Sequence, residues 1–547
     1  MTDQDDGPDA PPTGPTPAQS PGTGPTPAQP PGTGPTPAQS PGTGPTPAQP
    51  PGTGPTPAQS PGTGSTSAEA RGTGSTPADP APPGPSVPPG PPVPPAPSDL
   101  TELAAEAYIY GYPLVFDLSM VQAALHEGFG SLPSASFNEF AHAARLATPD
   151  AHFVSVNNDT VYSIAQLDLS GGPLLLHVPD TLGAYYVLQF IDAWSNNFAY
   201  VGRRATGTGE TKWLIVPPGW AGETPEGMTG VIDAPTTVAS IAGRFACDGP
   251  ADLPRVHGLQ RRLTLKVLEA VMHHNWLPTA DPDVPEPLHF FEKLRVWMAA
   301  FPPAADDRAY QDRFQPLQLL EEGPSPYRHA APELVHALTE GLKRGAARVE
   351  KAGHSGVDGV RAPGAWEMNP HLFDYNLDWF GVGTRDSPEW RIADRTSSYL
   401  TRAVAARVGL WGNHGYEAVY AHTFEDADGH WLNGSRKYTL RFDSPLPVRS
   451  FWSVTMYDSP DYFLVANPAD RYSIGDRTPG LVYGDDGSLT LHIQKDRPAD
   501  PAEAANWLPA PQGDFRPMLR LYTPEQSVLD GSYRIPPITP KREPETG

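Results

Sequence analysis

The sequence has 547 residues, of which 38 are basic and 62 are acidic, and its formal net charge is −24. Such a charge argues against nucleic acid and against an anionic membrane surface as the main partner. The single cysteine, Cys247, excludes an internal disulfide bond. No stretch approaches the roughly 20 apolar residues of a membrane-spanning helix, and the acidic beginning, MTDQDDGPDA, lacks the apolar run of a signal peptide. We therefore expect a cytoplasmic protein without a membrane partner.

Residues 1–98 are predicted to form a disordered tail. Proline and glycine are concentrated there, and the unit GPTPAQSPGT repeats with serine and proline alternating at one position. Full copies begin at Gly14, Gly24, Gly34, Gly44 and Gly54. A segment with so few apolar side chains cannot offset the entropy lost on ordering, so polyproline-like character is expected. The tail is interpreted as dispensable, with a spacer or a ligand for a proline-binding partner as the alternative.

A helix is predicted directly after the tail. Ser98 or Asp99 is placed to cap it, Glu102 lies in its first turn, and apolar residues follow at helical spacing. Gly111 and Pro113 interrupt this pattern, because glycine and proline both disfavour a helix interior. We therefore expect a break or kink near YIYGYPL.

From about residue 152 to 217 the apolar residues alternate with a period of two. In YYVLQFID, for example, Tyr186, Leu188 and Phe190 share one face of a strand. The turn-forming stretches SGGP, PDTLG, TGTGE and PPGW separate such runs. The pattern predicts short antiparallel strands, and residues 99–249 are expected to form a helix and a first β-sandwich or jelly-roll-like lobe.

Residues 250–412 are predicted to form a helical insert. Apolar residues recur at helical spacing, and proline-rich loops separate the segments that carry them. The predicted helices cover 255–274, 289–301, 332–353 and 397–413.

Residues 413–540 return to a strand-like pattern and are expected to form a second β lobe. Candidate strands are YTLRF, SFWSVTMYD, LVYG and SLTLHIQK. The closing segment, 506–537, is rich in proline, so we expect it to wrap over the sheet and not to add central strands. The complete fold prediction is an α+β, mainly β protein with two antiparallel β-sandwich or jelly-roll-like lobes and a helical insert.

Several stretches are similar to known domain families. AYIYGYPL, NNDTVYSIAQLDL and YYVLQFIDAWSNNFAYVGRRATG resemble the bacterial DUF1254 family. DADGHWLNGSRKYTLRF and FWSVTMYDSPDYFLVANPADRYSIGDRT are similar to the DUF1214 domain that usually follows it. The resemblance implies two β-sandwich lobes with helices between them. It implies no activity, since both families are domains of unknown function.

The first candidate site residues lie in VNNDTVYS. Asn157, Asn158, Asp159 and Tyr162 match the family's N-x-D-T-x-Y pattern. Asp159 is a candidate catalytic base, and the two amides and the tyrosine are candidates for binding a polar substrate. The alternative is an Asx-turn that only leads the chain into a strand.

A second group follows the strand YYVLQFID. It contains Asp192, Trp194 and Asn196, and then Arg204 in the glycine-flanked stretch GRRATG. We name Arg204 as catalytic, because its guanidinium can hold a carboxylate or a phosphate. Trp194 and Tyr186 are predicted to bind substrate. The alternative for Arg204 is a structural ion pair with a nearby aspartate.

The second lobe contributes Tyr457 and Tyr472 as predicted substrate-binding residues and His492 as a catalytic residue. Aromatic side chains alternating with hydroxyl groups are suited to line a pocket for a sugar or an aromatic molecule. Acid–base chemistry needs partners of different pKa in one cleft, and we expect His492, Asp159 and Arg204 to meet there if the two lobes face each other.

No metal and no cofactor are expected. His414, Glu417 and His422 lie close in the sequence, but their spacing fits no standard metal template. The sequence also lacks a G-x-S-x-G nucleophile motif, a G-x-G-x-x-G loop and a P-loop.

Two functions remain open at this point. The first is a cofactor-independent enzyme of hydrolase, lyase or isomerase type that acts on a small polar molecule in a cleft between the lobes. The alternative is a non-catalytic carbohydrate- or protein-binding, or structural, β-sandwich protein. A small-molecule ligand is expected in the first case, and a homo-oligomer stays open in both.

Overall fold

The computed structural model of the chain describes residues 99–151, 154–268, 276–354 and 362–542. All of them belong to the compact unit Val87–Gly547, and the predicted tail lies outside the described residues. Among the described residues, no helix is both long and apolar enough to cross a lipid bilayer.

The first lobe is a β-sandwich of a five-stranded sheet, ordered β1-β2-β8-β4-β5, and a four-stranded sheet, ordered β7-β6-β3-β9. Apolar side chains from both sheets form one core, as their alternation predicts. The strands are β1 (Phe140–His142), β2 (Thr160–Asp168), β3 (Leu174–Val178), β4 (Tyr186–Asp192), β5 (Asn197–Gly202), β6 (Thr211–Val216), β7 (Gly230–Asp233), β8 (Val238–Ala246) and β9 (Thr264–Val267), with helix α2 (Leu253–Gln260) between the last two.

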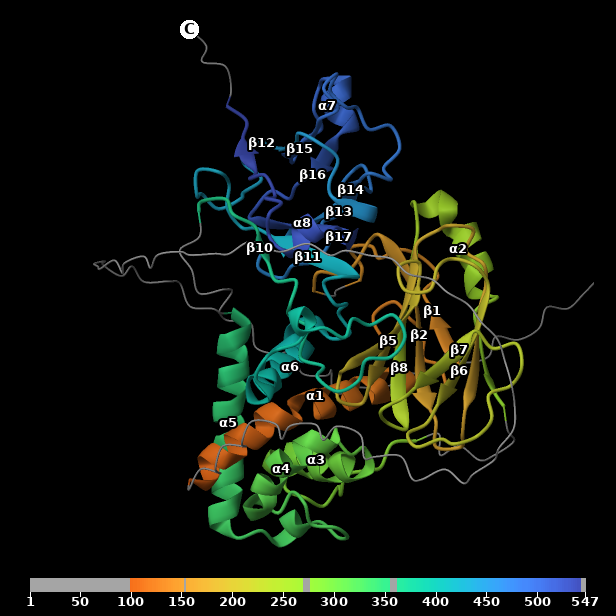
Figure 1. Cartoon of the computed structure of the whole chain (residues 1–547). Coiled ribbons are helices and arrows are strands. Elements are labelled where there is room, and N and C mark those ends of the chain that lie inside the picture. The colour runs from red at the N-terminus through yellow and green to blue at the C-terminus, as the bar shows by residue number, and fades with distance from the viewer. Residues whose placement is uncertain (1–98, 152–153, 269–275, 355–361, 543–547) are drawn as a thin grey trace, which may run out of the picture. The chain divides into compact units, whose positions relative to one another are not determined.

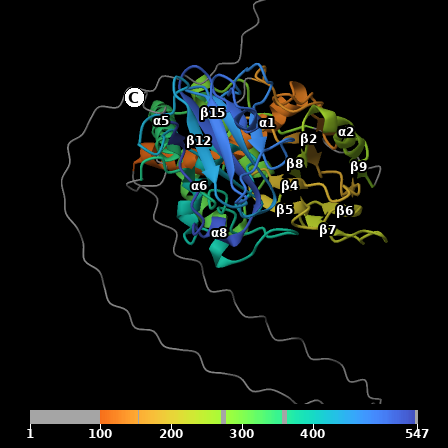
Figure 2. The same ribbon diagram turned by 90° about the horizontal axis from the view of Figure 1, so that it is seen from above.

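The second lobe repeats this plan with a five-stranded sheet, ordered β10-β11-β17-β13-β14, and a four-stranded sheet, ordered β16-β15-β12-β18. Figures 1 and 2 show its strands in teal to dark blue and the strands of the first lobe in orange to yellow-green. The elements are β10 (Glu367–Met368), β11 (Ala418–His422), β12 (Tyr438–Phe442), β13 (Val448–Asp458), β14 (Ser473–Gly475), β15 (Leu489–Gln494), α7 (Pro501–Ala505), β16 (Trp507–Pro509), β17 (Phe515–Pro524), α8 (Gln526–Leu529) and β18 (Thr539–Pro540).

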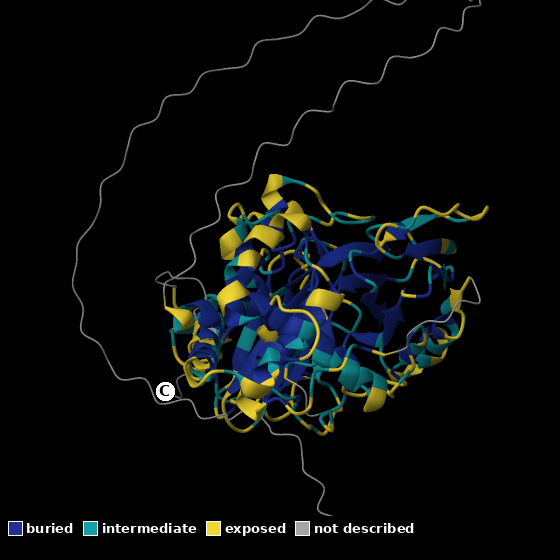
Figure 3. Ribbon diagram, turned by 90° about the horizontal axis from the view of Figure 1, so that it is seen from below, coloured by how far each residue is buried: buried dark blue, intermediate teal, exposed yellow. Residues whose placement is uncertain are grey.

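The helices form a third body of structure with its own apolar core. They are α1 (Leu100–His126), α3 (His289–Ala300), α4 (Arg308–Gln311), α5 (Pro332–His354) and α6 (Arg395–Gly409). Helix α1 packs against α3, α5 and α6 (Figure 1). Buried residues accordingly lie on the strands and the inner helix faces, while loops and outer helix turns are exposed (Figure 3). The mainly β fold with two sandwich lobes and a helical insert is therefore confirmed.

Helix α1 confirms one expectation and corrects another. Asp99 caps it by accepting a hydrogen bond from the backbone N–H of Thr101 at 2.9 Å. The predicted break is wrong, because the helix continues through Gly111 and Pro113. A Cβ atom at Gly111 would lie only 2.4 Å from Leu294 of α3, so the glycine permits a close helix crossing. Packing of this kind outweighs the local preference against helix.

Part of the predicted helix over 255–274 is also wrong. The helix ends with α2, and Thr264–Val267 forms strand β9 at the edge of the four-stranded sheet, paired with β3. A run as short as TLKV fits the helical period and the strand period equally well. Pairing with the edge strand β3 stabilises the extended conformation. The remainder of the prediction, 269–274, lies outside the described residues.

Three further expectations about the strands are corrected, the first of them in the closing segment. Strand β17 lies in the centre of its sheet, between β11 and β13. Its Pro517 is tolerated because it lies one position beyond the last residue paired with β11, which is Met518. The predicted strand LVYG is absent from the described elements. Nor are all strands antiparallel, since β6 pairs with β7 and β15 pairs with β16 in parallel.

The two lobes share a hydrophobic cluster. Tyr185, Val187, Tyr200 and Ala246 of the first lobe join the apolar core of the second lobe. This shared core brings polar residues of the first lobe against the central sheet of the second.

Candidate functional site

A tight turn between β4 and β5 places Asp192 at the end of its strand. The Asp192 carboxylate accepts hydrogen bonds from the backbone N–H groups of Trp194 and Asn196 at 2.9 and 2.8 Å. It also accepts one from the Asn196 side-chain amide at 2.9 Å. Ser195, between them, has a φ of 64°, in the left-handed region that a closed turn requires. Asparagine and aspartate at these positions thus shape the turn and fix the carboxylate.

Two neighbouring segments close over this turn. The Trp194 indole N–H donates to the backbone carbonyl of Phe301, after α3, at 2.9 Å. The Thr236 hydroxyl accepts from the backbone N–H of Ala193 at 3.1 Å and donates to the carbonyl of Val238. The turn is therefore held between the first lobe and the helices.

The opposite wall comes from helix α6 and two loops that Arg395 ties together. Arg395 pairs with Asp307 at 2.7 Å and with Asp378 at 2.5 Å. The Tyr399 hydroxyl also donates to Asp307, at 2.8 Å. Arg402, one helical turn beyond Tyr399, projects from the same face of α6 and lines the pocket.

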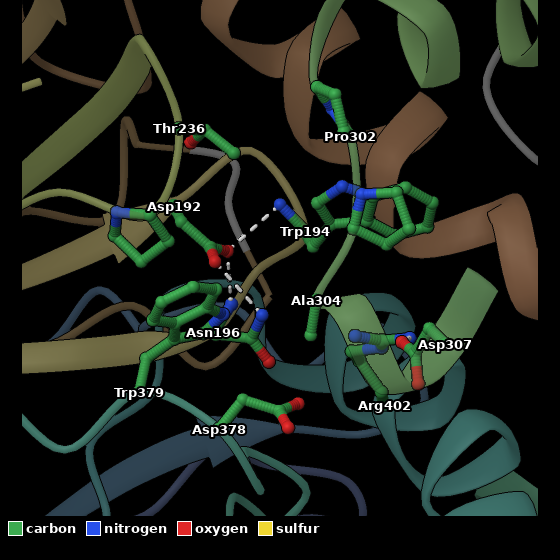
Figure 4. Close-up of a pocket in the computed structure, with 12 residues that line it drawn as sticks. Asp192, Trp194, Asn196, Thr236, Pro302, Ala304, Asp307, Asp378, Trp379 and Arg402 are labelled. Carbon is green, nitrogen blue, oxygen red and sulfur yellow. Dashed lines mark hydrogen bonds and ion pairs between the residues drawn. The ribbon is translucent and has the colours of Figure 1, made fainter. Parts of the chain in front are cut away.

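Between these walls lies a small pocket, with about 260 Å³ of space between atoms, part of it open to solvent. In Figure 4 Asp192 and Asn196 come from one side, and Arg402 and Asp307 from the other. The lining residues are Asp192, Trp194, Asn196, Pro235, Thr236, Pro302, Pro303, Ala304, Asp307, Asp378, Trp379 and Arg402. We call this the Asp192–Arg402 pocket.

The electrostatics of the pocket are unusual. Burial raises the pKa of Asp192 to about 6, although its hydrogen bonds with Asn196 and Trp194 and the charge of Arg402 act in the opposite direction. Only 1% of Asp192 and 5% of Arg402 is exposed. A desolvated carboxyl group that titrates near neutral pH beside a buried cation is typical of a functional site.

The predicted cluster at Asn157–Asp159 lies elsewhere, where the two lobes meet. Asn157 forms the Asx-turn: its side-chain oxygen accepts from the backbone N–H of Asp159 at 2.7 Å and of Thr160 at 3.1 Å. The Asp159 carboxylate instead accepts from Ser453 at 2.6 Å and from Tyr522 at 3.1 Å, both in the second lobe. The segment therefore turns the chain and also joins the lobes.

This interface is buried and rich in charge. Asp159 is 3% exposed and Arg520 is 2% exposed. Arg520 donates to the backbone carbonyl of Ser155 and to the hydroxyl groups of Thr455 and Tyr457, each at 2.8 Å. Burial acts to lower the pKa of Arg520, but neighbouring tyrosines and Asp159 raise it overall. Asp159 is thus one of the groups that keep this buried cation charged.

Arg204 joins the same interface through a different partner. Its Nε donates to the carboxylate of Glu417, which is 1% exposed, and its Nη2 donates to the backbone carbonyl of Gly383. Glu417 also accepts from the hydroxyl of Tyr185 at 2.9 Å, and the Tyr185 ring contacts Tyr522. Arg204 and Asp159 therefore belong to one connected network.

The other predicted residues are dispersed. Tyr457 joins the interface by donating to the carbonyl of Val156, and Asn158 accepts from Ser473 of the second lobe at 3.2 Å. Tyr162 lies under the Arg244 guanidinium.

Tyr186 is buried in the first-lobe core, where it stacks on Phe245. Tyr472 donates to Asp470 near the surface. His492, on β15, lies 4.0 Å from Glu503, and burial lowers its pKa. No described contact joins His492 to Asp159 or Arg204. Of the predicted substrate-binding residues, Trp194 lines the Asp192–Arg402 pocket.

The side chains of His414, Glu417 and His422, which lie close in the sequence, have separate partners. His414 contacts the Tyr200 hydroxyl at 2.9 Å, and burial lowers the pKa of His414 to about 3. His422 lies 3.4 Å from Glu367. A separate group, Asp426, Asp428 and His430, has possible ligand atoms within 4.8 Å of one another, in the part of the chain that the structure describes. The Asp426 carboxylate, however, pairs with Arg436 and accepts hydrogen bonds from two backbone N–H groups of its own turn. These partners compensate the buried negative charge of Asp426.

Both β lobes match family models. Residues 137–267 match the model described as protein of unknown function DUF1254, and residues 417–526 match the one described as protein of unknown function DUF1214. The chain therefore contains a DUF1254 segment and a DUF1214 segment. The predicted resemblance is thereby confirmed.

Solved structures show what the DUF1254/DUF1214 chain is similar to. The VPA0106 protein from Vibrio parahaemolyticus matches 81% of this chain and 100% of its own, with 22% identity and a TM-score of 0.62. At that identity the likeness shows the fold alone. An uncharacterized protein from Burkholderia cenocepacia matches 80% of this chain and 89% of its own, with 12% identity and a TM-score of 0.36, too low to show a shared fold. No curated protein matches the DUF1254/DUF1214 chain.

The sequence singled out the stretch that holds Asp192, Trp194 and Asn196, of which only Trp194 was named as a binding residue, and gave no prediction for Arg402. Asp192, Trp194 and Asn196 stand in one polar stretch after a strand. Arg402 carried a weaker signal: it lies on the apolar face of a predicted helix, among Tyr399 and buried alanines. A charged residue on such a face needs a buried partner, and that could have singled it out.

Proposed function

We propose that the DUF1254/DUF1214 body is a cofactor-independent enzyme that moves a proton on a small polar molecule bound in the Asp192–Arg402 pocket. One observation carries the proposal: a buried carboxyl group with a pKa of about 6 borders a small cavity next to a buried cation. A group that titrates near the working pH can both accept and return a proton.

The chemistry of the lining favours proton transfer over nucleophilic attack. The described lining residues include carboxylates, an amide, a guanidinium and the Thr236 hydroxyl, which already donates to the carbonyl of Val238, but no serine, cysteine or histidine. The ionised form of Asp192 would take a proton from the bound molecule, and the protonated form would give it back at another atom. An isomerase or lyase type of reaction fits this sequence of steps best.

The pocket lies between the first lobe and the helices, whereas the sequence predicted a cleft between the two lobes. Within the proposal, Asp159 and Arg204 have structural roles, because the buried Asp159 and the partly buried Arg204 both form pairings that hold the lobes together. Trp194 keeps its predicted role of contacting the substrate.

The proposal predicts that Asp192→Asn removes turnover. Wild-type protein is incubated in D2O with short hydroxy acids, keto acids, amino acids and simple sugars, and proton NMR follows exchange, isomerisation and elimination. Where the wild type reacts, we expect the variant to be slower by roughly 10²–10⁴-fold, the usual contribution of a general acid–base group. Asp233→Asn, an exposed aspartate at the end of β7, is the matched control and should react like the wild type.

Asp192→Asn keeps the acceptor oxygen for the two backbone N–H groups but loses the acceptor for the Asn196 side-chain amide, so the variant should fold with a loss of about 1–3 kcal/mol in the free energy of unfolding. Turnover that survives in Asp192→Asn would overturn the proposal. Binding without turnover in both proteins would favour the alternative, a non-catalytic small-molecule-binding protein.

A further inference from the structure

Arg402 is a buried cation without a hydrogen-bond partner for two of its nitrogens. It is 5% exposed, and neither its Nε nor its Nη2 has a hydrogen-bond partner among the described residues. The nearest carboxylate oxygen, Oδ2 of Asp307, lies 3.9 Å from Nη2, beyond hydrogen-bond distance. Leaving charged N–H groups unpaired in a protein interior is unfavourable, so a partner for them is expected.

The carboxylates near Arg402 are already engaged with other donors. Asp307 and Asp378 pair with Arg395, and Asp307 also accepts from Tyr399. Asp192 accepts the three hydrogen bonds of its turn. Arg402 is therefore left with its donors free for a molecule that enters the pocket.

The surroundings of Arg402 orient it for this task. Its guanidinium lies near the faces of Tyr110, Trp194 and Tyr399, at 5.9, 5.5 and 5.6 Å from the ring centres. Aromatic faces hold the plane of an arginine and cannot accept in-plane hydrogen bonds. The N–H groups at the edge of that plane match the two oxygens of a carboxylate.

We propose that the molecule bound in the Asp192–Arg402 pocket is a short monocarboxylate whose anionic group pairs with Arg402. This deepens the proposed function and rests on it. The pocket is small and its lining closes in from two sides, so it suits a short molecule and not a large one. Pro302, Pro303 and Trp379 give the rest of the molecule an apolar wall. A dianion is disfavoured, because Arg402 is the one cation among the described lining residues and three carboxylates line the same space.

The binding of an anion should depend on pH through Asp192. Above its pKa of about 6, Asp192 is ionised and repels a second negative charge, whereas below it the repulsion is lost. Affinity should therefore rise as the pH falls through about 6. The other charged or titratable groups near this turn are Asp117, Asp307, Asp378, Arg395 and the tyrosines Tyr110, Tyr375 and Tyr399.

These neighbours can be separated from Asp192 by experiment. Burial raises the pKa of all three tyrosines further above the physiological range, so they stay protonated. Burial also raises the pKa of Asp117, which makes it the competing carboxyl group. Asp117→Asn should leave the pH dependence of binding unchanged, and Asp192→Asn should abolish it.

Calorimetry with propionate and lactate, each against its neutral amide, tests the inference on the full chain. We expect wild type to bind the carboxylates and not the amides, more tightly at about pH 5 than at about pH 8. Arg402→Gln should weaken carboxylate binding by at least about 10-fold, the loss expected for one charge-assisted contact. Arg407→Gln, on the same helix but paired with the exposed Glu350, should bind like wild type.

Equal binding of amide and carboxylate by wild type would overturn the inference, even if Arg402→Gln failed to fold. Equal carboxylate affinity of wild type and Arg402→Gln would also overturn it. Turnover of a neutral molecule that depends on Asp192 would leave the proposed function standing without the inference. Carboxylate binding that needs Arg402, without any turnover, would support the inference about the ligand and contradict the proposed enzymatic function.

Discussion

Replacing Asp159 with asparagine is expected to lower the free energy of unfolding by about 3–5 kcal/mol, the usual cost of removing one partner from a buried charge network. Asp159 accepts hydrogen bonds from Ser453 and Tyr522, and its charge helps keep Arg520 ionised. The neutral amide would still accept a hydrogen bond but would leave the cation less well compensated. Urea unfolding followed by tryptophan fluorescence measures the loss.

Two further variants make this result specific. Tyr522→Phe removes only a hydroxyl group that bridges Asn157 and Asp159, so we expect a smaller loss of about 1–3 kcal/mol. Asp150→Asn, at an exposed position, should leave stability unchanged. If Asp159→Asn unfolded at the same urea concentration as wild type, Asp159 would not contribute to joining the lobes.

The second large effect is expected at Glu417. Replacing it with glutamine should cost up to about 3–5 kcal/mol, because the partly buried Arg204 would lose its counter-charge. Burial acts to lower the pKa of Arg204, but Glu417, together with Tyr416 and Tyr200, raises that pKa overall. Glu417 also accepts from Tyr185, so the substitution disturbs both lobes.

A double-mutant cycle separates this ion pair from its surroundings. Arg204→Met together with Glu417→Leu leaves no unpaired charge, so the double variant should be more stable than the sum of the two single losses predicts. Strictly additive losses would show that the two side chains act independently and would contradict the pairing.

The lobes and most helices could be predicted because their signals are local. Period-two alternation marks the strands around YYVLQFID, and the cap at Asp99 marks the start of α1. Gly111 misled the prediction, since its close approach to Leu294 is a tertiary contact. Pro517 led to the wrong prediction that its segment adds no central strand. Its position is tolerated because the pairing with β11 ends at Met518, and this too is a tertiary feature.

The candidate site was less accessible to sequence reasoning. Asp192 and Asn196 shape one turn and stand together, so their stretch could be recognised. Arg402 enters the pocket from a helix far along the chain, and only the folded structure brings it opposite Asp192. Asp159 was recognised from its dense polar neighbourhood, yet its partners Ser453 and Tyr522 lie 294 and 363 residues away. Residue type alone could not separate a structural junction from a binding site.

The most direct test of the account is a crystal structure of the wild-type protein grown with propionate at about pH 5, where Asp192 is protonated. We predict a carboxylate in the Asp192–Arg402 pocket with its oxygens roughly 2.7–2.9 Å from Nε and Nη2 of Arg402. Propionate bound only elsewhere on the protein, with Arg402 surrounded by water alone, would contradict the account.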